Sequence, residues 1–159
     1  MSQTTSRIRQ SLATLGIVLP KVAGPFGAYV PAKLIGNLIY VSGQLPMSSG
    51  KLLATGQIPS RCSIETAQAA ARQCVINALA AVETLGEEML DRIVGVLRVG
   101  AFVSSDATFT QQPSVANGAS ELLIQLFGDA GKHCRAAVGV NTLPLDAAVE
   151  IEFIFVISN

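Results

Sequence analysis

The fold of this 159-residue chain is decided by residues 63–86, which read SIETAQAAARQCVINALAAVETLG. Apolar and small side chains recur there at spacings of three and four, the pattern of one buried face of a helix of about six turns. Ser63 is suited to cap the helix, Glu65 favours its first turn, and Gly86 follows its end. The small residues predict close packing against a sheet. The residues on that face are Ala67, Ala71, Cys74, Val75, Ala78, Val82 and Leu85.

Extended segments and a second helix surround this helix along the chain. The second helix is predicted from Ser114 to Phe127, and residues 46–59 are expected to form a surface loop around a short hairpin. The predicted strands are two segments within 29–44, broken near Gly36 and Asn37, followed by 93–103, 136–143 and 149–157. The order β-β-α-β-α-β-β predicts an α+β fold in which a single mixed sheet carries two helices on one face.

An amphipathic helix is also predicted for residues 5–15, ended by Gly16. The residues expected on its buried side are Ile8, Leu12 and Leu15. We interpret it as a short N-terminal extension, about residues 1–20, of one domain that spans residues 1–159.

The last predicted strand indicates that the chain assembles with copies of itself. One face carries Val149, Ile151, Phe153, Phe155 and Ile157, and the other carries Glu150, Glu152, Ile154 and Val156. Helices on one side of a sheet cover only one of these faces, so the other most simply packs on a symmetry mate. The composition agrees, because 50% of the residues are hydrophobic and only 14% are charged.

The composition argues against several classes of protein. Eleven basic and eleven acidic residues give a net charge of zero without a basic run, so nucleic-acid binding is not expected. No apolar run approaches the roughly 20 residues that span a bilayer, and no signal-peptide core follows the N-terminus, so we expect a cytoplasmic protein without a membrane partner. Cys62, Cys74 and Cys134 share no metal-ligand spacing and His133 is the only histidine, so neither a metal nor a cofactor is expected.

Two separated motifs resemble the RidA/YjgF family. Residues 36–46, GNLIYVSGQLP, are similar to that family's segment of Gly-Asn, a hydrophobic run, Ser-Gly-Gln and a hydrophobic-Pro pair. Residues 135–140, RAAVGV, are similar to its arginine-led strand, and 143–144 and 149–152 resemble its Leu-Pro turn and acidic closing strand. Phe102, Val103, Phe109 and Asn117 fall at the expected intervals between the motifs. The resemblance covers about residues 24–157, and the extra N-terminal helix is typical of a longer branch.

The resemblance implies a chorismate-mutase-like fold, a barrel-forming homotrimer and three clefts between subunits. Family members with established chemistry hydrolyse reactive 2-imino or enamine acids to 2-keto acids and ammonia, which makes a small carboxylated metabolite the expected partner. One alternative is a trimeric module that binds such a metabolite without turnover. Another is the endoribonuclease or translation-inhibitor activity with which relatives are labelled, although neutral charge and a single histidine argue against it.

The resemblance implies roles for two charged residues. Arg135 matches the arginine that holds the substrate carboxylate, and a guanidinium makes such contacts through two parallel hydrogen bonds. Glu150 matches the acidic residue that activates water, for which partial burial and a raised pKa would suit it. Without the motif, Arg135 reads as half of a surface salt bridge and Glu150 as a solvated carboxylate or an interface ion pair. Glu152 is interpreted as structural.

Five further residues are candidates for substrate binding by the same resemblance. Tyr29 matches a tyrosine that closes the cleft, although its hydroxyl could equally cap a backbone group. Ser42 lies where the Ser-Gly-Gln motif lines the pocket, and Gly43 allows a ligand close to the backbone. Asn117 matches an asparagine that faces the cleft, although Gly118 follows it here and Asn117 could serve only to orient a loop. Ala137 stands where many members have cysteine, and its carbonyl can still accept a hydrogen bond.

The residues just before Arg135 depart from the family pattern, and one ion pair is expected elsewhere in the chain. The family's usual Pro-Ala pair before the arginine is His133-Cys134 here, which alters the rim of the predicted site. His133 could have a role at this rim, although one exposed histidine is more often incidental. Arg98, inside an apolar strand, is expected to pair with Glu150 or Glu152.

Overall fold

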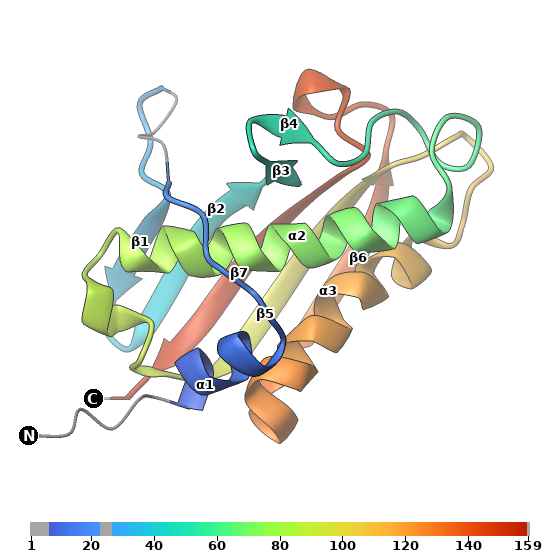
Figure 1. Ribbon diagram of the computed structural model, residues 1–159. Helices are drawn as coiled ribbons and strands as arrows, with labels where there is room; N and C mark the ends of the chain where they lie inside the picture. The colour runs from blue at the N-terminus through green and yellow to red at the C-terminus, as the bar shows by residue number, and fades with distance from the viewer. Residues whose placement is uncertain (1–6, 23–26, 159) are drawn as a thin grey trace, which may run out of the picture.

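The computed structural model describes residues 7–22 and 27–158. They form a five-stranded mixed sheet in the order β1-β2-β7-β5-β6, in which β5 and β6 are parallel and the other neighbours antiparallel. Helices α2 and α3 lie on one face of this sheet (Figure 1). The predicted α+β fold and element order are therefore confirmed. The strands are β1 (Ala32–Ile35), β2 (Leu38–Gln44), β5 (Ile93–Ser104), β6 (Cys134–Val140) and β7 (Val149–Ile157).

Helix α2 (Ile64–Glu83) follows the predicted pattern closely. The Ser63 side chain accepts a hydrogen bond from the Thr66 N–H at 3.1 Å, which confirms the predicted N-cap. Ala67, Ala71 and Ala78 are fully buried, so the helix backbone packs close to the sheet. The helix ends with Thr84 as its C-cap, two residues before Gly86.

Helix α3 (Gln112–Phe127) starts two residues earlier than predicted, with Pro113 in its first turn. Proline is favoured there because the first helical N–H groups have no partner within the helix. Gly118 lies against α2 so closely that a Cβ atom would overlap the carbonyl of Gln68. The two helices therefore pack backbone to backbone at this point.

The N-terminal helix α1 (Arg7–Thr14) confirms most of the prediction for residues 5–15, of which 5 and 6 lie outside the described residues. Ile8 and Leu12 are buried as expected. Leu15 is 38% exposed, so its predicted burial is wrong. Gly16 adopts φ +66° and turns the chain, which brings the Ile17 N–H to the Leu12 carbonyl at 2.9 Å and packs Ile17 against the core instead.

The loop before α2 contains the predicted hairpin, made of β3 (Met47–Ser48) and β4 (Lys51–Leu52). Asn77 of α2 holds it in place, because Asn77 Nδ2 donates to the carbonyls of Leu45 and Met47 at 2.9 and 3.0 Å. Near the other end of the chain, β6 begins and ends earlier than predicted, since residues 141–143 leave the sheet before the turn η3 (Pro144–Asp146).

The sheet face opposite the helices has no cover among the described residues. Along β7 the side chains alternate between fully buried ones on the helix side and half-buried ones on the other side, as the sequence predicts. The open face also carries Tyr40, which pairs with Ile154, and Val138, which pairs with Phe102. Tyr40 and Val138 are 45% and 46% exposed. No helix in the described part of the chain is long and apolar enough to cross a membrane.

Candidate functional site

Arg135 lies on the helix side of β6, the strand at one end of the sheet. Its register partner on β5 is Val99, which is fully buried under the helices. The guanidinium reaches α3, where Nη1 donates to Asn117 Oδ1 at 2.9 Å and to Ser120 Oγ at 3.0 Å. Nε and Nη2 have no partner among the described residues. Hydrogen bonds therefore hold the guanidinium at Nη1, and Nε and Nη2 are available to a ligand.

Asn117 and Ala137 lie beside this arginine, so three of the predicted site residues come together. Asn117 is exposed on α3 and holds Arg135 through its side-chain oxygen. Ala137 shares a face of β6 with Arg135 and pairs with the buried Ala101 of β5. Its side chain packs against the core and has no polar atom to offer a ligand.

The structure adds two residues that the sequence did not single out as binding residues. Ser120 lies one turn after Asn117 on α3, and its Oγ is 2.9 Å from His133 Nε2. His133 Nδ1 is 2.6 Å from the carbonyl oxygen of Gly131. The single histidine is thus half-buried and hydrogen-bonded on both nitrogens. The expectation of an exposed histidine is wrong, because the turn before β6 folds the imidazole back onto α3, and a role of His133 at the rim stays a prediction.

Glu150 lies on the open face of the sheet, since its β5 partner is Phe102 and its neighbour Val149 is buried on the helix side. Burial, and after it the charge of Glu152, raises the pKa of Glu150 above the ordinary carboxyl value. Its carboxylate lies directly over Gly43, where a Cβ atom would overlap Glu150 Oε1. Gly43 therefore makes room for a protein carboxylate in this structure.

Ser42 lies next to Gly43 on β2 and connects this strand to the segment that follows Tyr29. The Ser42 hydroxyl donates to the Val30 carbonyl at 2.7 Å, and its N–H donates to the Pro31 carbonyl at 3.0 Å. Ser42 thus fastens the segment that follows Tyr29 to β2. The Tyr29 side chain is 53% exposed.

The predicted site residues form two groups that do not meet within one chain. Arg135, with Asn117 and Ala137, lies on the helix side of the end strand. Glu150, with Gly43, lies on the opposite face of the sheet, two strands away. Two strand spacings are roughly 10 Å, and the sheet itself separates the two side chains. One small molecule bound to a single chain cannot touch both groups.

Arg98 forms the structural pair that was expected. Its Nη2 lies 3.6 Å from Glu152 Oε1, which identifies Glu152 rather than Glu150 as the partner. The Glu152 side chain covers Gly100, where a Cβ atom would come within 2.7 Å of Oε1. Glu152 is therefore engaged on the open face while Glu150 has no ion-pair partner among the described residues.

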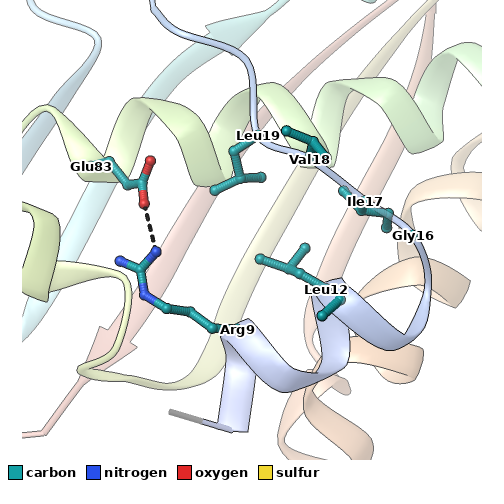
Figure 2. Close-up of a pocket in the computed structure, with 8 residues that line it drawn as sticks. Arg9, Leu12, Gly16, Ile17, Val18, Leu19 and Glu83 are labelled. Atoms are coloured by element: carbon teal, nitrogen blue, oxygen red, sulfur yellow. Dashed lines mark ion pairs between the residues drawn. The ribbon is translucent and has the colours of Figure 1, made fainter. Parts of the chain in front are cut away.

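Figure 2 shows a hollow of about 490 Å³ in another part of the molecule, between α1, the 16–19 segment and α2. Leu12 and the apolar side chains of 17–19 line it, and the ion pair between Arg9 and Glu83, at 3.2 Å, closes one end. None of the predicted site residues borders it. Among the described residues no group of histidine, cysteine and acidic side chains could hold a metal ion.

Comparison with known proteins connects these residues to a family. The family model described as "YjgF/chorismate mutase-like, putative endoribonuclease" matches residues 9–157. The chain belongs to the YjgF family. The match covers both predicted motifs, so the resemblance inferred from residues 36–46 and 135–152 is confirmed.

Individual YjgF relatives match nearly the full chain. Protein TCP17 of Trypanosoma cruzi is 40% identical over 157 residues, which cover 98% of this chain and 97% of that protein. The 2-iminobutanoate/2-iminopropanoate deaminase of Dermatophagoides farinae is 32% identical over 89% of this chain and 94% of its own length. The crystal structure of Atu1372 from Agrobacterium tumefaciens, a protein of unknown function, superposes with a TM-score of 0.87 at 43% identity, over 96% of this chain and 93% of that one.

Proposed function

We propose that this YjgF protein hydrolyses 2-imino acids, and the enamine acids in equilibrium with them, to 2-keto acids and ammonia in clefts between three identical chains. Membership of the family supports this proposal, as does the likeness to a mite protein named as a 2-iminobutanoate/2-iminopropanoate deaminase. The observation that carries it is the division of Arg135 and Glu150 between opposite sides of one sheet. The open face and the free edge at β6 are surfaces through which two copies can bring these groups together.

The chemistry needs one group for the carboxylate and one for water. The free edge of the Arg135 guanidinium holds the substrate carboxylate, which places the imine carbon beside it. Glu150 of the neighbouring copy takes a proton from water as the oxygen attacks that carbon, and the carboxyl group then passes this proton to the nitrogen. The resulting carbinolamine loses ammonia and leaves the keto acid. A half-buried carboxylate with a raised pKa is suited to both proton transfers.

Mixing two inactive variants tests the division of the site. Arg135→Ala chains keep Glu150, and Glu150→Gln chains keep Arg135, so a mixed trimer contains clefts with both groups intact. Random assembly of equal amounts restores about a quarter of wild-type activity, since each cleft draws its halves from two chains. Activity is measured as keto acid released from 2-aminoacrylate, generated by a serine dehydratase. If mixing restores nothing although each variant assembles, the shared cleft is wrong.

The single variants test the chemistry. Arg135→Ala lowers kcat/KM by about 100-fold, because two charge-assisted hydrogen bonds to the carboxylate are lost. Glu150→Gln lowers kcat by about 100-fold or more, with a smaller change in KM. If wild-type protein leaves the decay of 2-aminoacrylate unchanged, the hydrolase proposal fails.

A binding module without turnover is the second candidate, favoured by the apolar side chain of Ala137 and by the altered rim at His133. Calorimetry with 2-oxobutanoate distinguishes the two candidates. Binding that depends on Arg135 in a protein without turnover supports the module. RNA cleavage that survives both Arg135→Ala and Glu150→Gln would indicate a contaminant rather than the activity named in the family description.

A further inference from the structure

We propose that Ser120 and His133 form a hydrogen-bond relay that holds Arg135 in place and presents one edge of its guanidinium, the Nε and Nη2 side, to the substrate carboxylate. The inference rests on the proposed function in one respect, since it takes Arg135 as the group that binds the carboxylate. Both residues act through Arg135, so they are positioning residues.

The direction of every hydrogen bond in the relay follows from its chemistry. The Gly131 carbonyl can only accept, so His133 Nδ1, 2.6 Å away, carries a proton. In a neutral imidazole the other nitrogen, Nε2, then has a lone pair and accepts from the Ser120 hydroxyl at 2.9 Å. With its proton turned toward His133, Ser120 Oγ is left as an acceptor for Arg135 Nη1 at 3.0 Å.

The relay decides which part of the guanidinium is free. Nη1 has two hydrogens, and the structure uses both, one for Ser120 Oγ and one for Asn117 Oδ1. The Nη1–Nη2 end of the guanidinium therefore cannot grip a carboxylate with two hydrogen bonds. The Nε–Nη2 side keeps two parallel N–H groups without partners among the described residues, and this is the geometry that a bidentate carboxylate needs.

The position of Arg135 explains why such support matters. An arginine on an end strand has little around it to restrict its rotamers, and ordering a long side chain during binding opposes affinity. Asn117 and Ser120 lie one turn apart on α3 and grip the same nitrogen from adjacent positions. His133 in turn fixes the direction in which the Ser120 hydroxyl hydrogen points. The arginine is thus ordered before the ligand arrives.

The tautomer of His133 gives a test that does not depend on activity. Because the chain has one histidine, its two imidazole nitrogens give unambiguous signals in long-range proton–nitrogen correlation spectra. In the neutral form of His133 we expect the proton on Nδ1. In Ser120→Ala the Nε2 signal shifts, because its hydrogen bond is lost. A proton found on Nε2 in the wild-type protein overturns the relay.

Binding measurements test the effect on Arg135. Calorimetry with 2-oxobutanoate is expected to show about three- to tenfold weaker binding for Ser120→Ala, the cost of ordering one long side chain. Ser120→Thr keeps the hydroxyl and restores most of the affinity. His133→Ala weakens binding by a smaller factor, since Ser120 remains. The matched control is Ser114→Ala, a serine on the same helix outside the relay, which binds like wild type.

A double-variant cycle shows whether Ser120 acts through the arginine. In an Arg135→Lys background, Ser120→Ala is expected to cause less than a twofold further loss, because the group that it positions is absent. An undiminished loss in that background, or wild-type affinity in Ser120→Ala, refutes the relay while leaving the proposed function intact. If the wild-type trimer binds no 2-keto acid, or Arg135→Lys binds as wild type does, the proposed function itself fails.

Discussion

The two faces of the central sheet differ in what they require from the rest of the molecule. The helix side is closed within one chain, since Ile151, Phe153 and Phe155 are at most 1% exposed beneath α2 and α3. The open side carries both apolar and charged side chains and has no cover among the described residues, so Tyr40 and Val138 keep nearly half of their surface in water. One face is covered within the chain, and the other is the surface on which we propose that copies of the chain pack.

The difference between the two faces limits where catalytic residues can lie in such a small domain. The closed face is dominated by aliphatic side chains at native packing, so charged groups have no room there. Glu150 lies on the open face, and Arg135 lies at the edge of the closed one. Both predicted catalytic groups therefore lie outside the closed core, at surfaces that a second copy of the chain could reach.

The largest expected loss of stability comes from a substitution on the closed face. Phe153→Ala removes a fully buried ring that stacks on Phe155 at 5.8 Å between centroids, and it is expected to lower the free energy of unfolding by about 3–5 kcal/mol. Urea denaturation of the dilute protein measures this. Its neighbour Ile154 faces the open side, and Ile154→Ala serves as the matched control with a loss below about 1.5 kcal/mol. Equal losses would remove the distinction between the faces.

The next effect concerns assembly. Tyr40→Glu places a charge in the middle of the open face, where burial against another copy would leave it unpaired. We expect a folded chain whose trimer dissociates at least about 100-fold more readily, as measured by sedimentation at several concentrations. Its far-ultraviolet circular dichroism remains that of the wild type. Unchanged assembly would mean that this face is not an interface.

A smaller effect is expected from Gly43→Ala. The added methyl group overlaps the Glu150 carboxylate, whose flexible end can move away, so activity falls about tenfold while unfolding changes little. Ser48→Ala, in the nearby hairpin, is a suitable control for general disturbance of this loop. A Gly43→Ala variant with full activity would show that the position of Glu150 over β2 is not needed for catalysis.

The smallest expected effect is a pH dependence of stability that comes from Glu150. Burial raises the pKa of Glu150 above its ordinary value of 4.5, so the folded chain binds that proton more tightly than the unfolded chain does. Stability is consequently lost as the pH rises from 4.5 through the raised value. Glu150→Gln avoids this loss and is expected to be more stable at neutral pH by less than about 1 kcal/mol, with no advantage below the ordinary value. Thermal unfolding across this range measures the difference. A stability advantage of Glu150→Gln that grows as the pH falls would contradict the expected direction.

Residue spacing within each segment predicted the helices and strands, whereas contacts between distant segments were harder to predict. The spacing in residues 63–86 and the alternation in 149–157 gave α2 and β7 nearly to the residue, because each pattern follows from the geometry of one element. Leu15 was misplaced because the helix stops one residue before it. The strand order depends on long-range register, which no single segment encodes.

The site shows the same limit. The family motif led to Arg135, Asn117 and Glu150, but a motif does not show on which face of the sheet each side chain lies. The contact between Ser120 and His133 joins a helix to the turn before a strand, and its only signal in the sequence was the replacement of the usual Pro-Ala pair at 133–134. A polar residue where a family has proline indicates a side chain that can take a hydrogen-bond partner.

β6 has a further consequence for how the protein is made. It ends the strand order, so one side of its backbone has no neighbouring strand among the described residues, and its single charged side chain is turned onto α3. An unguarded edge of seven residues pairs readily with whatever strand it encounters. Overproduction is therefore expected to favour insoluble material even when every chain has folded well.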